Sequence, residues 1–330
     1  MQRAFVTGGS GFVGRHLVAE LRRQGVAVRA LARSPDAART VGRAGAEVVT
    51  GELHDVAALQ AGMAECDVVF HAAAIVADWG EARHFHRVNV EGTEAVLAAA
   101  RGAGVPRFVH VSTDAVLAGP QPLVRVTEAT PRPAAPYGPY ARTKGLAEER
   151  VLAANTAAMA TVIVRPRFVW GRGDTSVLPK LEAAVRAHRF RWIDHGRYLT
   201  SSTHVANVVE GLVLAARRGT PGAIYFVTDG APIEFRTFVT GLLETQGVRP
   251  GNRSLPRRVA WRLAGIVETC WGLLHLSITP PISRMVVKMM GEEVTLDDSR
   301  ARRELGYVGG MTVEAGLREM SDAAGTPPEG

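Results

Sequence analysis

The sequence predicts an α/β protein in which helices cover both faces of a doubly wound parallel sheet, followed by a smaller, mostly helical C-terminal domain. Short apolar runs alternate with segments whose apolar residues recur at helical spacing, a pattern typical of buried parallel strands joined by helices. This alternation holds as far as Gly171 and then becomes irregular. A chain of 330 residues is long enough to give each domain its own core.

Each element of the sheet domain is predicted from its own run of residues. Strands are expected over residues 4–7, 26–32, 48–50, 68–71, 108–112, 161–165 and 223–227. Helices are expected over residues 15–24, 56–64, 85–101, 143–154 and 205–216. The sheet domain is therefore predicted to comprise residues 1–174 and 203–228, and the second domain residues 175–202 and 229–330.

Composition narrows the class of protein. Hydrophobic residues make up 46% of the chain and charged residues 22%, which indicates a soluble, folded protein. The net charge of +7 comes from scattered arginines, so it favours anionic cofactors or lipid surfaces over nucleic acid as partners. Cys66 and Cys270 form no CxxC or Cys/His cluster, so we expect no metal site and a reducing, cytoplasmic location.

Neither end of the chain predicts a membrane or export segment. The first strand begins at once, which leaves no room for a charged and then apolar targeting segment. The longest uncharged run near the C-terminus, residues 269–283, is shorter than the roughly 20 residues that span a bilayer. We therefore expect no transmembrane helix.

A glycine-rich loop lies between the first strand and the first helix. Its sequence, Thr-Gly-Gly-Ser-Gly-Phe-Val-Gly, fits both GxxGxxG and GxGxxG. Small residues let the backbone approach a pyrophosphate, which the free N–H groups and the positive end of the helix stabilise. The loop therefore predicts a dinucleotide site on a Rossmann sheet, with contacts from Gly8, Ser10, Gly11, Phe12, Val13 and Gly14.

The second strand indicates which dinucleotide is bound. A carboxylate at its end would accept hydrogen bonds from the ribose hydroxyls of NAD. The segment from Val28 to Ser34 contains no acidic residue, and Arg33 is placed to meet a 2′-phosphate. The sequence therefore predicts NADP in preference to NAD, with a solvated surface role for Arg33 as the alternative.

Tyr140 and Lys144 stand four positions apart in Pro-Tyr-Ala-Arg-Thr-Lys, and Lys144 is one of three lysines among 39 basic residues. Residues at this spacing share a helix face, so we expect the Lys144 ammonium to lie near the Tyr140 phenol. A fixed cation lowers the pKa of a phenol from its usual value of about 10 and makes it usable as an acid or base. The pair is typical of an oxidoreductase.

With these parts in place, the chain resembles the extended short-chain dehydrogenase/reductase family along nearly its whole length. The further segments that carry the resemblance are residues 51–53, 67–74, 89–93, 111–113, 165–166 with Gly171, and 305–307. The resemblance implies that Thr113 is the third catalytic residue beside Tyr140 and Lys144, and that the second domain binds substrate. It further implies a homodimer and cofactor contacts from Glu52, Leu53, His71, Ala72, Ala73, Tyr140, Lys144, Pro166 and Val169.

Within that family the chain looks most like the 3β-hydroxysteroid dehydrogenase branch, because His71-Ala-Ala is followed by Trp79-Gly80. This implies hydride transfer between a secondary alcohol and a ketone on a steroid-like, long-chain or polyketide-like substrate. Ala115 stands where sugar-nucleotide dehydratases would need an acid. The alternatives are a sugar-nucleotide epimerase or reductase, using arginines such as Arg167, and a non-catalytic NADP-binding sensor.

Candidate substrate residues are Trp79, Asp114, Arg167 and Trp192, although the aromatic rings could equally belong to the core and Asp114 could bond the adjoining backbone. Residues 255–276 mix arginines with tryptophan and leucine. That segment is expected to cover the substrate site, and its basic, Trp-bearing composition also fits peripheral contact with a membrane.

Overall fold

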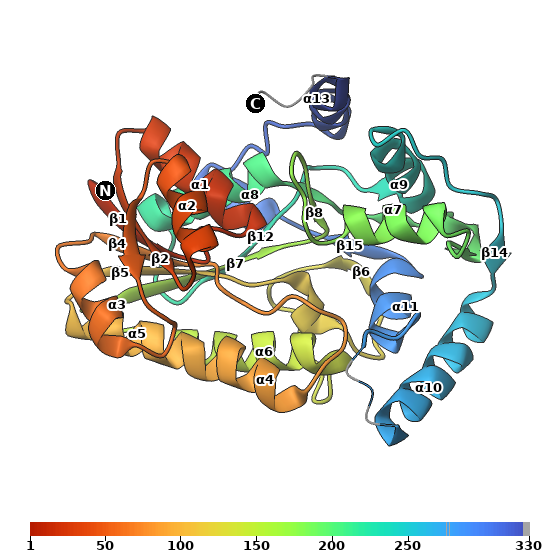
Figure 1. Cartoon of the computed structure of the whole chain (residues 1–330), viewed down its shortest axis with the longest axis horizontal. Helices are drawn as coiled ribbons and strands as arrows, with labels where there is room; N and C mark the ends of the chain where they lie inside the picture. The colour runs from red at the N-terminus through yellow and green to blue at the C-terminus, as the bar shows by residue number, and fades with distance from the viewer. Residues whose placement is uncertain (275, 277, 326–330) are drawn as a thin grey trace.

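Seven parallel strands form the central sheet of this computed structural model, which describes residues 1–274, 276 and 278–325 (Figure 1). The strand order is β12-β7-β5-β4-β1-β2-β3. The strands are β1 (Arg3–Thr7), β2 (Ala27–Ala32), β3 (Glu47–Thr50), β4 (Val68–His71), β5 (Arg107–Val111), β7 (Ala160–Pro166) and β12 (Ile224–Val227). The order runs outward in both directions from β1 and β4, so the sheet is doubly wound, as predicted.

Helices cover both faces of this sheet (Figure 1). One apolar core lies under α1 (Phe12–Arg23), α2 (Pro35–Arg43), α8 (Val205–Arg218) and α12 (Ser299–Leu305). The other lies under α3 (Val56–Met63), α5 (Gly92–Gly102) and α6 (Gly138–Ala153). Successive strand residues such as Ala4 and Phe5 enter opposite cores, because side chains alternate across a sheet.

Two helical features differ from the prediction. Helix α2 was not predicted, because Val41 is its only buried residue and its start depends on Ser34, whose hydroxyl accepts from the Ala37 N–H at 3.2 Å. The predicted helix over 85–101 is divided into α4 (Ala82–His86), a π-turn η1 (Arg87–Glu91) and α5. A π-turn inserts one extra residue into the helix, which apolar periodicity does not reveal.

The C-terminal region is helical but also contains a small sheet that the sequence did not predict. Its order is β13-β10-β15-β6, from β6 (Leu123–Val126), β10 (Leu199–Thr200), β13 (Ile233–Glu234) and β15 (Val294–Leu296). Two further pairs join β8 (Val169–Trp170) to β11 (Thr203–His204) and β9 (Trp192–Ile193) to β14 (Ser254–Leu255). Strands of two to four residues are too short to show alternation.

The remaining helices belong to the second half of the chain. They are α7 (Leu178–Arg186), α9 (Phe235–Glu244), α10 (Arg257–Leu273), α11 (Arg284–Met290) and α13 (Val313–Gly325), with the short 3-10 turns η2 (Asp114–Leu117) and η3 (Asp194–Gly196). Helix α10 lies at the edge of the molecule beside α11 (Figure 1). His275 and Ser277, which fall in the predicted uncharged run, lie outside the described residues.

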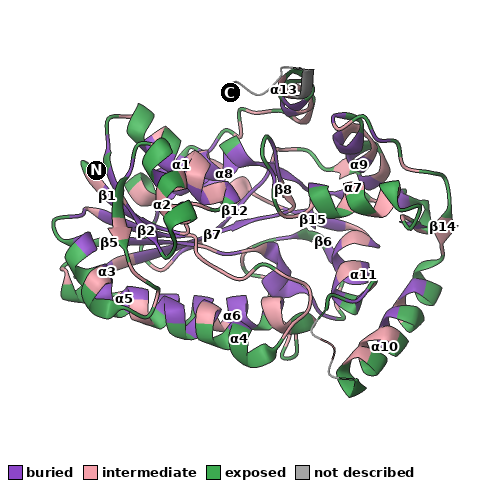
Figure 2. Cartoon of the chain, in the orientation of Figure 1, coloured by how far each residue is buried: buried purple, intermediate pink, exposed green. Residues whose placement is uncertain are grey.

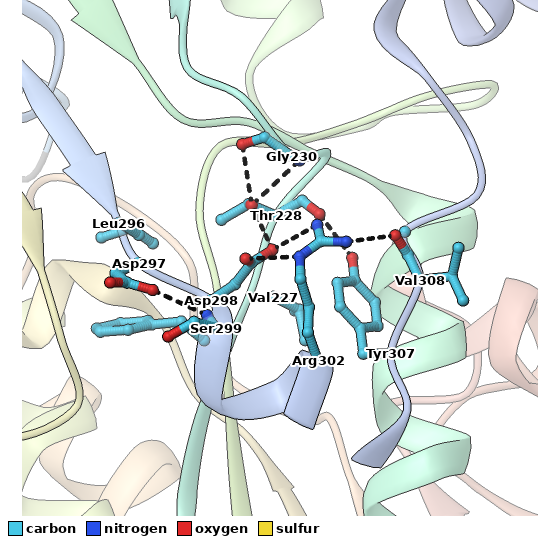
Figure 3. Close-up of polar contacts among 12 residues, drawn as sticks. Val227, Thr228, Gly230, Leu296, Asp297, Asp298, Ser299, Arg302, Tyr307 and Val308 are labelled. Atoms are coloured by element: carbon cyan, nitrogen blue, oxygen red, sulfur yellow. Dashed lines mark hydrogen bonds and ion pairs between the residues drawn. The ribbon is translucent and has the colours of Figure 1, made fainter. Parts of the chain in front are cut away.

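A polar network around Tyr307 fastens the C-terminal segment to the central sheet (Figure 3). The Tyr307 hydroxyl donates to the Thr228 carbonyl at 2.7 Å, just past the end of β12. Arg302 of α12 donates to both carboxylate oxygens of Asp298, at 2.8 and 2.9 Å, and Asp298 also accepts from the Thr228 hydroxyl. The Leu-Gly-Tyr segment is therefore structural, with Gly306 ending α12 in the left-handed conformation.

Candidate active site

The candidate site lies at the carboxyl ends of β1, β4, β5 and β7. Ligands of doubly wound sheets bind where the strand order reverses, which here is between β1 and β4. The glycine loop leaves β1 at this edge, and Thr113 follows β5 at the same edge. Helix α6 brings Tyr140 and Lys144 to this edge from the covering layer.

The glycine loop has no room for larger residues at two positions. Gly8 has φ +72°, and a Cβ there would lie 2.6 Å from the backbone nitrogen of Ala73. A Cβ on Gly14 would lie 2.0 Å from the Gly8 carbonyl oxygen. The N-terminus of α1 has no side-chain cap at Gly11, so its first N–H groups can donate to an anion. The loop therefore fits a dinucleotide pyrophosphate.

Tyr140 lies in the first turn of α6, partly buried among apolar residues. Burial raises the pKa of its phenol, while a hydrogen-bonding contact with the Thr113 side chain lowers it. The Thr113 hydroxyl also accepts from the Ala115 N–H at 3.1 Å, which fixes the turn that follows β5. Thr113 and Tyr140 thus face each other, in an arrangement that can hold one substrate oxygen between two hydroxyl groups.

Lys144 is 2% exposed, and its Nζ donates to the Val111 carbonyl at 2.7 Å. Burial lowers the pKa of its ammonium to about 8, against a smaller opposing effect of Glu148. The expected lowering of the Tyr140 pKa by Lys144 does not appear in this structure, where burial dominates and raises it. The difference arises because the ammonium is directed toward β5 by its hydrogen bonds.

Ser112, which precedes Thr113, belongs to a separate buried cluster. Its hydroxyl donates to Glu148 at 2.6 Å, and Glu148 also accepts from Arg165 at 2.7 and 2.6 Å. Glu148 and Arg165 are 1% and 2% exposed. This cluster ties α6 to β5 and β7 and keeps Ser112 away from the Tyr140 phenol.

The predicted substrate residues Asp114 and Arg167 form a buried ion pair. Arg167 donates to Asp114 at 2.7 Å, to the Thr200 hydroxyl and to the Met289 carbonyl at 2.7 Å. The side chains of Arg167 and Asp114 are 3% and 5% exposed. The structure therefore places both side chains in the interior, where they join η2, the end of β7, β10 and α11. Asp114 also accepts from the Thr113 hydroxyl at 3.3 Å.

The two predicted substrate tryptophans also have structural contacts. Trp192 is 1% exposed in an apolar cluster separate from that of Tyr140, and its indole N–H donates to the Gly251 carbonyl at 2.8 Å. Trp79 is half-buried and donates to the Leu276 carbonyl at 3.0 Å. Trp192 is thus core, whereas Trp79 connects the loop after β4 to the segment after α10.

The other predicted cofactor residues follow the carboxyl ends of their strands. Arg33 is exposed after β2, next to Ser34 at the start of α2. Glu52 is exposed and Leu53 half-buried after β3, and Ala72 and Ala73 follow β4 against Gly8. His71 is fully buried, with ring nitrogens 2.7 Å from the Thr7 hydroxyl and 2.9 Å from the Thr93 hydroxyl. Pro166 ends β7 and Val169 begins β8.

Two polar residues of the site have no role assigned from the sequence, although one of them, Asn89, begins the segment 89–93 that carries the family resemblance. Asn89, in the π-turn, donates to the Thr143 hydroxyl at 3.1 Å and accepts from the Ile75 N–H at 2.8 Å, so it links α6 to the loop after β4. His110 lies 2.9 Å from Lys144 Nζ. The sequence signal that could have pointed to His110 is its position inside the apolar run that predicts β5.

A groove opens between α10, α11 and the loop after η2. It has a volume of about 320 Å³ and is lined by Gly119, Pro120, Tyr137, Arg257, Arg258, Trp261, Arg262, Lys288 and Glu292. The rings of Tyr137 and Trp261 meet edge to face at 5.1 Å. Among the described residues, no helix is long and apolar enough to cross a bilayer, and no three His, Cys, Asp or Glu side chains are grouped to hold a metal ion.

Two curated relatives align with nearly the whole chain. A 4-hydroxy-2-methyl-3-oxo-4-farnesyl-3,4-dihydroquinoline-1-oxide ketoreductase of Stigmatella aurantiaca is 51% identical over 321 residues, covering 97% of this chain and 96% of the relative. A 3 beta-hydroxysteroid dehydrogenase/Delta 5-->4-isomerase of Mycobacterium tuberculosis (strain CDC 1551 / Oshkosh) is 33% identical over 336 residues, covering 96% and 89%. The chain is therefore an oxidoreductase of the extended short-chain dehydrogenase/reductase type, as predicted, and the sensor alternative falls away.

Solved structures and a family model agree with this assignment. The structure of MoeE5 in complex with UDP-glucose and NAD superposes with a TM-score of 0.74 at 25% identity, covering 97% of each chain. A nicotinamide dinucleotide is thus the cofactor class. The model of the 3-beta hydroxysteroid dehydrogenase/isomerase family matches residues 5–257. On the strength of this match and of the two relatives, the chain belongs to the 3-beta hydroxysteroid dehydrogenase/isomerase family.

Proposed function

We propose that this enzyme interconverts a secondary alcohol and a ketone on a hydrophobic substrate, with Tyr140 as the acid and base. The observation that carries the proposal is the meeting of Tyr140 and Thr113 beside Lys144, at the sheet edge that also holds the glycine loop. Methionines of α11, including Met285 and Met289, share the apolar cluster against which Tyr140 packs. An apolar wall at the reacting group suits a lipophilic substrate.

Each residue has a separate task in the proposed reaction. When bound, a nicotinamide dinucleotide would supply or accept the hydride at the substrate carbon. Tyr140 donates its proton to the oxygen of the substrate as that carbon is reduced, and takes it back in the oxidation. Thr113 hydrogen-bonds the same oxygen and fixes its position. Lys144 would bind the ribose hydroxyls of the cofactor, and the glycine loop and the N-terminus of α1 would hold its pyrophosphate.

A substrate screen that follows the absorbance of the reduced nicotinamide tests this proposal. Hydroxysteroids, aliphatic β-hydroxy and β-keto compounds, and sugar nucleotides should be compared with NADPH or NADP. Turnover of compounds from the first two classes supports the proposal. Turnover of sugar nucleotides alone would favour the epimerase or reductase alternative, whose arginine candidate Arg167 is buried in an ion pair.

We expect NADPH to bind more tightly than NADH because Arg33 is exposed beside the start of α2, where it can meet a 2′-phosphate. The variant Arg33→Gln should weaken NADPH binding by roughly tenfold to a hundredfold, the value of one charge-assisted hydrogen bond, and leave NADH binding unchanged. Fluorescence titration of each cofactor measures both affinities. The variant Arg43→Gln, at an exposed position of α2, is the matched control. Equal or tighter NADH binding by the unaltered enzyme would contradict the prediction.

We further propose a cytoplasmic enzyme that pairs as a homodimer, divided into the sheet domain (residues 1–174 and 203–228) and a substrate-binding domain (175–202 and 229–330). Both cysteines are free, Cys66 buried and Cys270 exposed, which suits a reducing compartment. The four-stranded sheet draws β10, β13 and β15 from the second domain and β6 from the first, so the two domains share a continuous interface.

Helix α10 supports peripheral contact with an anionic membrane. Helix α10 has many exposed residues (Figure 2). The apolar stripe among them, at helical spacing along α10 and just past its end, consists of Val259, Leu263, Ile266, Leu273 and Leu274, which are 42%, 43%, 61%, 74% and 67% exposed. The opposite face packs against α11 through Ala260 and Ala264. Among the described residues neither Arg258 nor Arg262, beside the stripe, has an ion-pair partner. An apolar stripe bordered by cations is typical of a helix lying in the membrane interface.

Sedimentation with lipid vesicles checks this contact. At low salt the protein should co-sediment with vesicles containing phosphatidylglycerol, and more of the double variant Leu263→Ser/Ile266→Ser should remain in the supernatant, because two of the five apolar side chains of the stripe become polar. The variant Val76→Ser, at a 59% exposed position outside α10, is the control and should still bind. Failure of the unaltered protein to bind these vesicles would remove the proposed membrane contact.

A further inference from the structure

A buried histidine on β5 contacts the lysine of the site. His110 is completely buried, and its Nε2 lies 2.9 Å from Lys144 Nζ. The same ammonium donates to the Val111 carbonyl at 2.7 Å. An ammonium has three N–H groups. Two are therefore directed at consecutive residues of β5, and one remains for a ligand at the sheet edge.

The protonation state of His110 follows from this contact. An ammonium can only donate, so His110 Nε2 must accept, and the ring must be neutral with its proton on Nδ1. Burial keeps the pKa of His110 well below its usual value, with further lowering by Lys144 and then by His71. His71, whose ring lies 5.2 Å away, has a pKa of about 3 for the same reason. The rings of His71 and His110 are both neutral, and Lys144 is the cation among these three side chains.

We propose that His110 is a positioning residue that holds the Lys144 ammonium at the end of β5 and leaves its third N–H for the cofactor ribose. This inference rests on the proposed role of Lys144 in the reaction. A lysine side chain has four rotatable bonds, and two fixed acceptors restrict it to one arrangement. Geometry that is already in place before the cofactor binds lowers the entropic cost of the productive complex.

Two other polar side chains near Lys144, Glu148 and His71, already have hydrogen-bonding partners. Glu148 lies one turn further along α6, but it is engaged by Arg165 and Ser112. Both nitrogens of His71 are bonded to the Thr7 and Thr93 hydroxyls. Removing the His110 acceptor therefore leaves Lys144 with the Val111 carbonyl as its remaining hydrogen-bonding partner among the described residues.

Lysine-selective isotope labelling tests the contact without cofactor or turnover. The chain has three lysines, so NMR spectra of ¹⁵Nζ-labelled protein contain three side-chain signals, assignable with Lys180→Arg and Lys288→Arg. The variant His110→Phe should lower the pKa of Lys144, because loss of the acceptor disfavours the charged form; we expect a fall of about one unit from the starting value near 8. In His110→Gln, which restores an acceptor, the pKa of Lys144 should return most of the way to its original value.

The same variants test the functional consequence. As the pH rises, cofactor affinity and kcat of His110→Phe should decline at a lower pH than those of the unaltered enzyme. In His110→Gln the pH of this decline should return toward its original value. Val109→Ala, a core substitution on the same strand, should change stability but leave the pH of this decline unchanged. An unchanged Lys144 pKa in a folded His110→Phe variant would overturn the inference. If the pKa shifts but Lys144→Met retains full turnover, the proposed role of Lys144 is wrong, while the contact with His110 stands.

Discussion

Replacing Tyr140 with phenylalanine is expected to lower kcat by about 10²-fold to 10⁴-fold, the usual contribution of a positioned acid or base. The substitution removes the hydroxyl that faces Thr113 and keeps the ring that packs in the apolar cluster with Met285 and Met289. The glycine loop and the N-terminus of α1 are untouched, so NADPH affinity should stay within about twofold of its original value. Steady-state kinetics and a fluorescence titration measure the two effects separately.

Tyr137 provides a matched control for this substitution. It lies three residues before Tyr140, and its ring packs against Trp261. The variant Tyr137→Phe removes one phenol from the same segment, so it should retain turnover. A Tyr140→Phe variant that keeps its turnover would sink the proposed mechanism, whereas a variant that loses NADPH binding as well would indicate that Tyr140 holds the cofactor rather than the proton.

The central sheet could be predicted because its signal is local. Each of its seven strands is a short apolar run, and the glycine loop fixes the start of the first helix at a position where backbone contacts leave no room for a Cβ. The spacing of Tyr140 and Lys144 likewise survives in the structure, since both belong to one helix. Sequence patterns thus predict structure that is determined by nearby residues within one helix or strand.

The rest of the site depends on contacts between distant segments. Asp114 and Arg167 are 53 positions apart, and the Met289 carbonyl that completes their network is a further 122 positions along the chain. The short strands of the second sheet are likewise fixed by their partners. The direction taken by Lys144 depends on His110, 34 positions earlier on another element. No periodicity connects such positions, so the sequence does not reveal that Asp114 and Arg167 bond each other.

The pair formed by Asp114 and Arg167 predicts a large change in stability. Replacing Asp114 with leucine leaves the Arg167 charge buried without its partner, and we expect the free energy of unfolding to fall by about 3–5 kcal/mol. Replacing both residues, as Asp114→Leu/Arg167→Met, removes the uncompensated charge along with the pair. The double variant should therefore be more stable than the single variant Asp114→Leu. Chemical denaturation followed by circular dichroism measures the unfolding free energies.

The milder variant Asp114→Asn separates this structural role from a contact with substrate. An amide oxygen still accepts a hydrogen bond from Arg167 but carries no charge, so stability should fall by less than in Asp114→Leu. If Asp114 instead bound substrate, Asp114→Asn would raise KM while leaving the unfolding free energy unchanged, and Asp114→Leu would unfold no more readily than the unaltered enzyme. We expect the opposite, a loss of stability with little change in KM, because both side chains of the pair are buried and Arg167 also bonds the Thr200 hydroxyl and the Met289 carbonyl. The Asp114 carboxylate also accepts from the Thr113 hydroxyl at 3.3 Å, so kcat is measured beside KM.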